Sequence, residues 1–432
     1  MDGVWRTEGY GMGVRIAGDS LRTYEITSVS CLPGFGAHRT GGSADEPVFT
    51  LDDAPFTFSL RPGPGGERRL HIDGAASERV MRRADALPAR CGQPPAKDAA
   101  AVFDVFWQTF REHYPFFADR GVDWEAVRRT YAPRAASASP QELFGILREI
   151  LASLRDAHTF LVAPDLHMGF SGSREDPYPV GDSGRARIRE IVDTRYLRAA
   201  PHAFANGQIH FGMLPDSIAY LRIGSFFGYV REGGYASWEN ALNAALDTVF
   251  ADTRGWRGVV IDVRVNGGGA DPLGLAIASR LATEPYTAYA KVARSDPDDP
   301  AKRTAPQPSV VRPGARPGWR GPVVELTSRY SVSAAETFTQ ALMGRRPAVE
   351  RVGENTQGVF SDVLGRTLPN GWRFGLPNEL FLTDDGKSFD GPGIPATVAV
   401  PTFTRDDLRA GRDPGLERAM EILKAQHQGT ER

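Results

Sequence analysis

The first 90 or so residues alternate between apolar and polar positions, which is the pattern of half-buried β-strands. A turn-rich stretch that begins at Pro62 interrupts this pattern, and a proline-containing segment at 87–97 ends it. We therefore predict an N-terminal β-module over residues 1–92, followed by a linker. The clearest candidate strands are 21–27, 48–51, 56–60 and 70–72.

The spacing of apolar positions changes to three and four residues after the linker, which predicts helices over residues 98–164. Val102, Phe103, Phe106 and Phe110 share one helix face. A later helix begins with Ser139-Pro-Gln-Glu, a serine N-cap with proline at the first position and glutamate at the third. The pattern is typical of a helical bundle, and His158 follows at the end of its last helix.

Residues 165–210 are rich in glycine, serine and proline and are predicted to form an arm or linker. From residue 211 onward, apolar strands alternate with helices, which indicates an α/β core with a largely parallel sheet. Residues 295–320 are expected to form an exposed excursion. The predicted core elements are strands at 219–223, 259–263 and 323–327, and helices at 238–251, 271–282 and 413–426.

Composition and charge exclude several classes of function. The net charge of −2 offers no electrostatic reason to expect nucleic acid as a partner. No apolar run is long enough for a membrane-spanning helix. The first residues lack the pattern of a signal peptide, so the chain reads as cytoplasmic, or as exported after removal of such a peptide.

The two cysteines, Cys31 and Cys91, leave two alternatives open. A disulfide between them would suit an exported protein, and two separate buried thiols would suit a cytosolic one. Localisation is therefore left undetermined. Neither cysteine belongs to a CxxC pair or a histidine cluster, and the remaining histidines show no ligand spacing, so no metal and no cofactor are expected.

Two strand-to-turn junctions carry the candidate chemistry. The first runs from Ile261 to Gly269 and ends in three consecutive glycines, where backbone amides can face a ligand. The GxxxxGK[ST] pattern of a phosphate loop is missing, so an oxyanion-binding turn fits better. The second places Ser333 at the start of a helix, where free amides stabilise negative charge. The alternative is that Ser331 or Ser333 is only an N-cap.

Five motifs together resemble the tail-specific (C-terminal processing) protease family, in the order that this family has them. With Leu154-Arg-Asp-Ala-His-Thr upstream, the resemblance covers about residues 98–425. It implies a ClpP/crotonase-like fold and serine peptidase activity on peptide or protein substrates. The motifs are Asp262-x-Arg-x-Asn-Gly-Gly-Gly, Ser331-x-Ser-Ala-Ala-Glu, Val352-Gly-Glu-Asn-Thr-Gln-Gly, Leu368-Pro-Asn-Gly and Asp390-Gly-Pro-Gly-Ile-Pro.

The family has a Ser–Lys branch and a tricorn-like Ser–His branch, and this sequence resembles the second. Val359 stands where the lysine of the first branch would follow the Thr-x-Gly turn. His158 matches the position of the histidine base, so Ser333 is expected as nucleophile. The resemblance implies Asp390 as the acid that orients the imidazole, although relatives have glutamate there. Glu354 and Asp362 are the reserve candidates.

The resemblance also implies an oxyanion hole made by the backbone amides of Ala334 and Gly268. Asp262, Arg264 and Asn266 are expected to brace the triglycine turn, and Glu336 to anchor the nucleophile helix. Too few strands are predicted between His158 and residue 219 for a PDZ domain, so the chain resembles the members that lack one.

Other functions are compatible with the same residues. A non-catalytic module that binds an apolar ligand would need a ligand-sized apolar cavity between the modules. An esterase or amidase acting on small molecules would use the same catalytic groups. An acyl-CoA reaction is a more remote alternative, because no adenine or phosphate site is apparent. The oligomeric state and the peptide sequence that is cut do not follow from the sequence.

Overall fold

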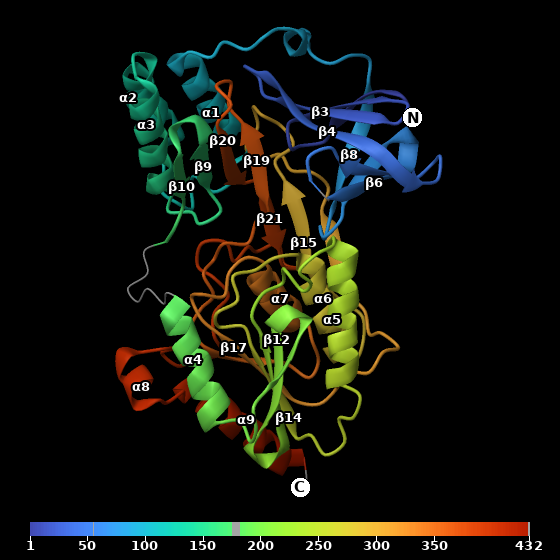
Figure 1. Ribbon diagram of the computed structural model, residues 1–432, viewed down its shortest axis with the longest axis vertical. Helices are drawn as coiled ribbons and strands as arrows, with labels where there is room; N and C mark the ends of the chain where they lie inside the picture. The colour runs from blue at the N-terminus through green and yellow to red at the C-terminus, as the bar shows by residue number, and fades with distance from the viewer. Residues whose placement is uncertain (55, 175–181, 431–432) are drawn as a thin grey trace.

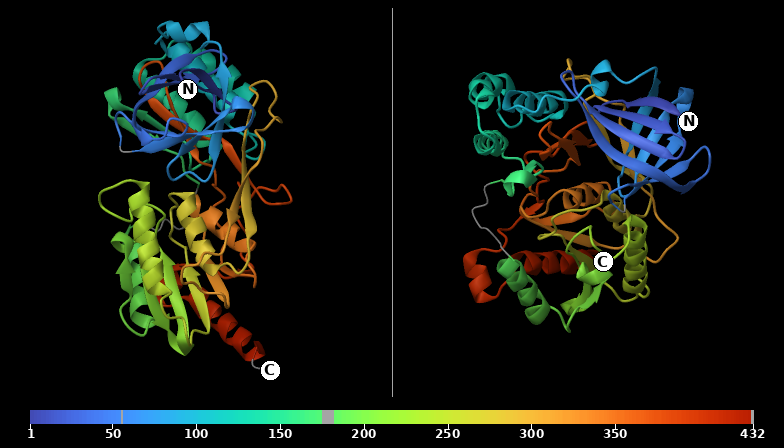
Figure 2. Two further views of the ribbon diagram at one scale, coloured as in Figure 1. Left: turned by 90° about the vertical axis from the view of Figure 1, so that its right-hand side faces the viewer. Right: turned by 45° about the horizontal axis from the view of Figure 1, so that its top comes forward.

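A computed structural model describes the whole chain except residues 55, 175–181 and 431–432. Its elements form two tiers (Figure 1): a β-barrel and a helical bundle make up the upper tier, and an α/β core makes up the lower one. The tiers remain distinct when the molecule is turned, and the barrel and bundle lie on opposite sides of the upper tier (Figure 2). Among the described residues, none of the helices has the length and apolar character that crossing a membrane requires.

The N-terminal β-module is a closed antiparallel barrel in which β8 pairs back onto β1. Closure pairs both edge strands, so no edge is open to another chain. Apolar side chains that include Trp5, Val14, Leu21 and Phe49 fill the interior. The strands are β1 (Gly3–Thr7), β2 (Met12–Ala17), β3 (Ser20–Ile26), β4 (Cys31–Gly42), β5 (Pro47–Leu51), β6 (Thr57–Pro62), β7 (Arg68–Ile72) and β8 (Glu78–Ala84).

Cys31 and Cys91 form a disulfide, which decides between the two alternatives left by the sequence. It ties β4 to the segment that leaves the barrel. Disulfides persist mainly in oxidising compartments, so this bond favours an exported protein over a cytosolic one.

Removing this disulfide is expected to cost stability. The bond closes a loop of 60 residues, so replacing both cysteines by alanine should lower the free energy of unfolding by about 4 kcal/mol. Urea unfolding followed by tryptophan fluorescence measures the difference. Wild-type protein unfolded in a reducing agent is the control and should match the double variant. An unchanged midpoint in both would contradict the prediction.

The helical bundle forms as the sequence predicts and packs on a four-stranded sheet. Ser139 and Glu142 make the expected capping box at the start of α3. The sheet has the order β10-β9-β20-β19, so strands from the C-terminal third complete the sheet that follows α3. The elements are α1 (Ala99–His113), α2 (Trp124–Ala136), α3 (Pro140–Leu154), β9 (Phe160–Ala163), β10 (Met168–Ser171), β19 (Val363–Thr367) and β20 (Arg373–Pro377).

The α/β core is built on a seven-stranded sheet of order β11-β12-β13-β14-β17-β18-β22, parallel from β13 onward. Its strands are β11 (His202–Phe204), β12 (Ile209–Leu214), β13 (Ile218–Ile223), β14 (Gly258–Asp262), β17 (Val323–Thr327), β18 (Glu350–Gly353) and β22 (Val398–Ala399). Its helices are α4 (Asp182–Arg195), α5 (Tyr235–Val249), α6 (Asp271–Leu281), α7 (Ala334–Met343), α8 (Arg405–Ala410) and α9 (Pro414–Thr430).

Helices cover both faces of this sheet. Val259 and Ile261 of β14 pack in the core that contains α5, α6 and α7. Val260 points to the opposite face, where side chains of α4 and α9 cover it. Successive side chains of a strand alternate between faces, and a strand buried on both faces therefore reads as a continuous apolar run. The prediction of a mostly parallel α/β core is confirmed.

Two segments contain more regular structure than the sequence predicts. The expected arm at 165–210 includes β10, α4 and β11, and the expected excursion at 295–320 includes β16 (Gln307–Val311). β16 pairs with β15 (Tyr286–Ala293), which also pairs with β21 (Glu379–Leu382). The reason is that α4 has a strongly polar composition and β16 contains a proline, so neither produces a clear apolar period.

Candidate active site

The candidate nucleophile lies in a turn between β17 and α7. Ser333 has φ 58° and ψ −121°, a conformation that residues other than glycine rarely adopt. Its backbone N–H donates to the Val359 carbonyl at 3.0 Å and to the Glu336 carboxylate at 3.2 Å. A strained serine between a strand and a helix is also the geometry of the nucleophile turn in α/β-hydrolases.

Ser331, the alternative serine, has a structural role. It is fully buried, its hydroxyl donates to the Val263 carbonyl at 2.9 Å, and the same oxygen accepts from the Ser328 amide at 3.1 Å. The first contact holds the turn against the end of β14, and the second stabilises the turn itself. Ser333 is therefore the better candidate nucleophile.

The triglycine turn packs directly against Ser333. A Cβ on Gly268 would lie 2.7 Å from the Ser333 Cβ, so a larger residue cannot be accommodated at this position. The Val332 amide donates to the Asn266 carbonyl at 3.1 Å, which joins the two turns. Asn266 also donates through Nδ2 to the Ile223 carbonyl at 3.1 Å. Asn266 therefore braces the turn, as the sequence predicts.

The two predicted oxyanion donors differ in their present contacts. Ala334 is the first residue of α7, and its amide donates no hydrogen bond to the described residues. The Gly268 amide donates to Asn266 Oδ1 at 2.8 Å. Gly268 lies beside the nucleophile as expected, but its N–H can bind an oxyanion only if the bond to Asn266 opens.

Buried charges fix the scaffold around these turns. Arg264 is 1% exposed and pairs with Asp262 at 2.6 Å and with Asp413 at 2.7 Å. The Glu336 carboxylate accepts from the amides of Gly358 and Val359 at 2.6 and 2.8 Å. Burial raises the pKa of Glu336 to about 7. Glu336 thus ties the 358–360 segment to the nucleophile helix, in the anchoring role that the sequence predicts.

His158 lies on the loop between α3 and β9, where its backbone N–H donates to Asp156 Oδ1 at 3.0 Å. Burial lowers the pKa of its imidazole, and the Asp156 and Asp362 carboxylates and the Ser361 backbone oppose that shift. The ring Nδ1 is buried without a hydrogen-bond partner among the described residues. A neutral imidazole with one open nitrogen is suited to accept a proton.

Asp156, which the sequence predicts only as a helix-end residue, has several buried contacts. It is 1% exposed and accepts from the Tyr114 hydroxyl at 2.8 Å and from Arg120 at 3.4 Å, in addition to the His158 amide. It therefore fixes the loop that carries His158. The motif around His158 contains this aspartate, but no local pattern in the sequence indicates its distant partners.

Asp390 contacts Arg120 rather than the imidazole. Its Oδ1 accepts from the Arg120 guanidinium at 3.0 Å, and its Oδ2 accepts from the Phe360 amide at 3.2 Å. Burial and the nearby Asp156 carboxylate raise the pKa of Asp390 to about 8, against the opposing effect of Arg120. Because Arg120 bonds both carboxylates, it links Asp390 to the loop that carries His158.

Of the two reserve acids, Asp362 is the one whose charge acts on the imidazole. The Asp362 carboxylate favours the positively charged form of the His158 imidazole. It also forms an ion pair with Lys291, with 2.6 Å between Oδ2 and Nζ. Glu354 pairs with Arg329 at 2.8 Å and is not among the groups that shift the His158 pKa.

A five-residue segment, 358–362, brings the predicted catalytic residues together. The Ser333 amide bonds to Val359, the Phe360 amide bonds to Asp390, and the Ser361 backbone faces His158. The Ser333 hydroxyl and the His158 ring make no direct hydrogen bond in the described structure. Catalytic hydrogen bonds are often long before substrate binds, so this geometry does not argue against the pair.

Position 359 and Lys291 bear on the alternative in which a lysine is the base. Val359, at the position of the family's lysine, is 1% exposed and packs in the core. Lys291 is buried between Asp362 at 2.6 Å and Glu379 at 3.1 Å. Although burial disfavours its charge, these carboxylates hold the pKa of Lys291 well above its usual value. A lysine that stays protonated cannot accept the serine proton.

The described residues include no group of three or more histidine, cysteine, aspartate or glutamate side chains arranged to hold a metal ion.

Two family models match parts of the chain. The model of peptidase family S41 matches residues 217–400, and that of the tricorn protease C1 domain matches residues 95–152. None of the curated proteins matches the sequence.

Solved structures resemble the chain over about three quarters of its length. A candidate peptidase from Parabacteroides merdae is 29% identical with a TM-score of 0.63, over 76% of this chain and 97% of that one. Mature CPAF is 11% identical with a TM-score of 0.55, over 76% and 96% of the two chains, which shows a shared fold only. The chain thus belongs, over residues 217–400, to the serine peptidase family S41, and its residues 95–152 match a tricorn-type C1 domain.

Proposed function

We propose that this protein hydrolyses peptide bonds through an acyl-enzyme, with Ser333 as nucleophile and His158 as general base. The observation that carries this proposal is the convergence of Ser333, His158 and Asp390 on the 358–362 segment. The S41 family assignment supports the reaction class.

The groups have distinct roles in the proposed reaction. Ser333 Oγ attacks the substrate carbonyl carbon while His158 accepts the hydroxyl proton. The Ala334 amide, at the start of α7, stabilises the oxyanion together with an amide of the triglycine turn. His158 then protonates the leaving amine, and a water molecule attacks the acyl-enzyme by the same route in reverse.

We assign to Asp390 a positioning role that acts through Arg120 and Asp156. Arg120 donates to both carboxylates, and Asp156 accepts from the backbone amide of His158. The relay supports the orientation of the imidazole from a distance. The Asp156 and Asp362 carboxylates favour the imidazolium electrostatically.

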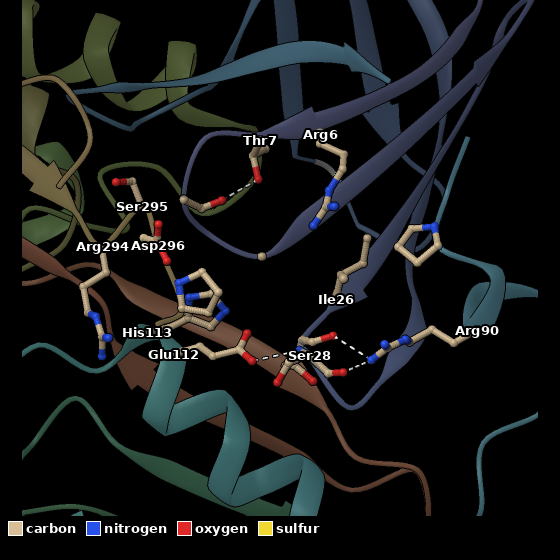
Figure 3. A pocket seen from close by; sticks show the side chains of 15 residues that line it. Arg6, Thr7, Ile26, Ser28, Arg90, Glu112, His113, Arg294, Ser295 and Asp296 are labelled. Atoms are coloured by element: carbon tan, nitrogen blue, oxygen red, sulfur yellow. Dashed lines mark hydrogen bonds between the residues drawn. The ribbon is translucent and has the colours of Figure 1, made fainter. Parts of the chain in front are cut away.

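An apolar-ligand module has less support. A cavity of about 290 Å³ does lie between the barrel, the end of α1 and the end of β15 (Figure 3). Its lining includes the charged side chains of Arg6, Arg90, Glu112 and Arg294, so a ligand bound there would meet several charged groups. Such a lining does not favour a hydrophobic ligand.

A fluorophosphonate probe tests the proposal, because it reacts only with an activated serine. We expect one equivalent of label on the peptide that contains Ser333, located by mass spectrometry, and no label on heat-denatured protein. Parallel assays with casein and p-nitrophenyl esters separate a peptidase from a small-molecule esterase. A protein that hydrolyses neither and takes up no label would overturn the proposal.

A further inference from the structure

A pocket of about 680 Å³ borders the triglycine turn on the side of α4. Figure 1 shows α4 beside the core sheet, and Val192 of α4 packs in the core on that face. One wall of the pocket is formed by glycines 267–269. The charged and titratable side chains that line it are Arg185, Arg189, His210 and Arg222.

The arginines of α4 face the pocket because an ion pair fixes the rotation of the helix. Asp193 binds Arg222 of β13 through two hydrogen bonds, at 2.8 and 3.2 Å. Residues four apart lie on the same helix face, so Arg185 and Arg189 lie on the same face as Asp193. Ile188 and Val192, on the adjacent face of the helix, are buried at 5% and 1% exposure, which also restricts its rotation.

The pocket carries excess positive charge. Asp193 neutralises Arg222, whereas Arg185 and Arg189 have no ion pair among the described residues. Among the residues that the structure describes, no carboxylate lines the pocket. Burial and the neighbouring arginines lower the pKa of His210, so the histidine adds no charge at neutral pH. Two uncompensated guanidinium groups favour a carboxylate as ligand.

The position of this pocket connects it to the reaction. Gly268 is part of its wall and also packs against Ser333. We propose that the pocket is a specificity subsite that binds the acidic side chain of an aspartate or glutamate close to the scissile bond. This inference rests on the proposed peptidase function. It names a class of substrate, peptides with an acidic residue near the cleaved bond. The catalytic residues alone do not determine that class.

Matched peptides test this subsite. Internally quenched peptides with amidated C-termini would carry aspartate or glutamate at single positions around the cleaved bond, each compared with its asparagine or glutamine counterpart. We expect kcat/KM to be on the order of tenfold higher for the acidic peptide at one position. The Arg185→Gln/Arg189→Gln double variant should bring this ratio close to one.

Arg187→Gln is the matched control, because Arg187 lies on the same helix, pairs with Glu190 and does not line the pocket. It should keep the wild-type ratio. Equal turnover of acidic and neutral peptides by the wild type would overturn the subsite. So would a preference that appears only with free C-termini, because the pocket would then bind the terminal carboxylate.

A binding experiment distinguishes failure of the proposed peptidase function from failure of the subsite. If the wild type cleaves no peptide, anisotropy measures binding of the same labelled peptides to it. Tighter binding of acidic peptides that the double variant loses would support the subsite without the hydrolase. Equal binding of both peptides would overturn it.

Discussion

Replacing Ser333 by alanine is expected to lower peptide hydrolysis by at least about 10⁴-fold, because no other group supplies the acyl-accepting oxygen. The change removes a single oxygen from a side chain whose backbone amide makes the anchoring contacts. The fold and the thermal midpoint should therefore remain close to those of the wild type. Turnover of a quenched peptide, with circular dichroism on the same samples, gives both quantities.

Ser331→Ala is the control for this experiment. It leaves the Ser328 amide without its partner in the interior, so we expect a loss of stability of about 1–3 kcal/mol. The folded protein should nevertheless hydrolyse peptide at a rate within the same order of magnitude as the wild type. If Ser331→Ala abolished the reaction and Ser333→Ala did not, the assignment of the nucleophile would be wrong.

Replacing His158 by alanine is expected to lower kcat/KM by about 10³- to 10⁴-fold, because Ser333 loses the base that accepts its proton. The wild type should also show an acidic limb in its pH profile. Since burial lowers the pKa of His158 below the ordinary value of 6.5, the midpoint of that limb should fall below pH 6.5. A base must be neutral to act, so the rate rises with pH through this midpoint.

His167→Asn is the control for His158. His167 is exposed on the adjacent hairpin with φ 52°, a conformation that asparagine tolerates. Activity and the acidic limb should both survive this change. A wild-type limb that persists in the residual activity of His158→Ala would show that another group titrates. In that case His158 would not be the base.

Local structure could be predicted from sequence where a short pattern determines it. Residues that are close together in the sequence determine the Ser139 capping box, the apolar face of α1 and the buried strands of the core. α4 and β16 were not predicted, because one is strongly polar and the other contains proline. Both are stabilised by neighbours that are distant in the chain.

The residues of the candidate site could be predicted from the sequence, but the contacts between them could not. Motif resemblance led to Ser333, His158 and Asp390. It did not reveal Arg120, which contacts Asp156 36 residues away and Asp390 270 residues away. Nor did it show that the Gly268 amide bonds to Asn266. Such contacts depend on how separate elements pack, and nothing in the local sequence encodes them.

The pairing of β20 with β9 has a consequence for the timing of activity during synthesis. The helical half that carries His158 is translated early, but the strand that completes its sheet begins at Arg373, after Ser333 has been made. A nascent chain that stops short of this strand holds both reactive groups without the scaffold that joins them. If Ser333 and His158 act together as proposed, peptide hydrolysis therefore requires that most of the polypeptide has first left the ribosome.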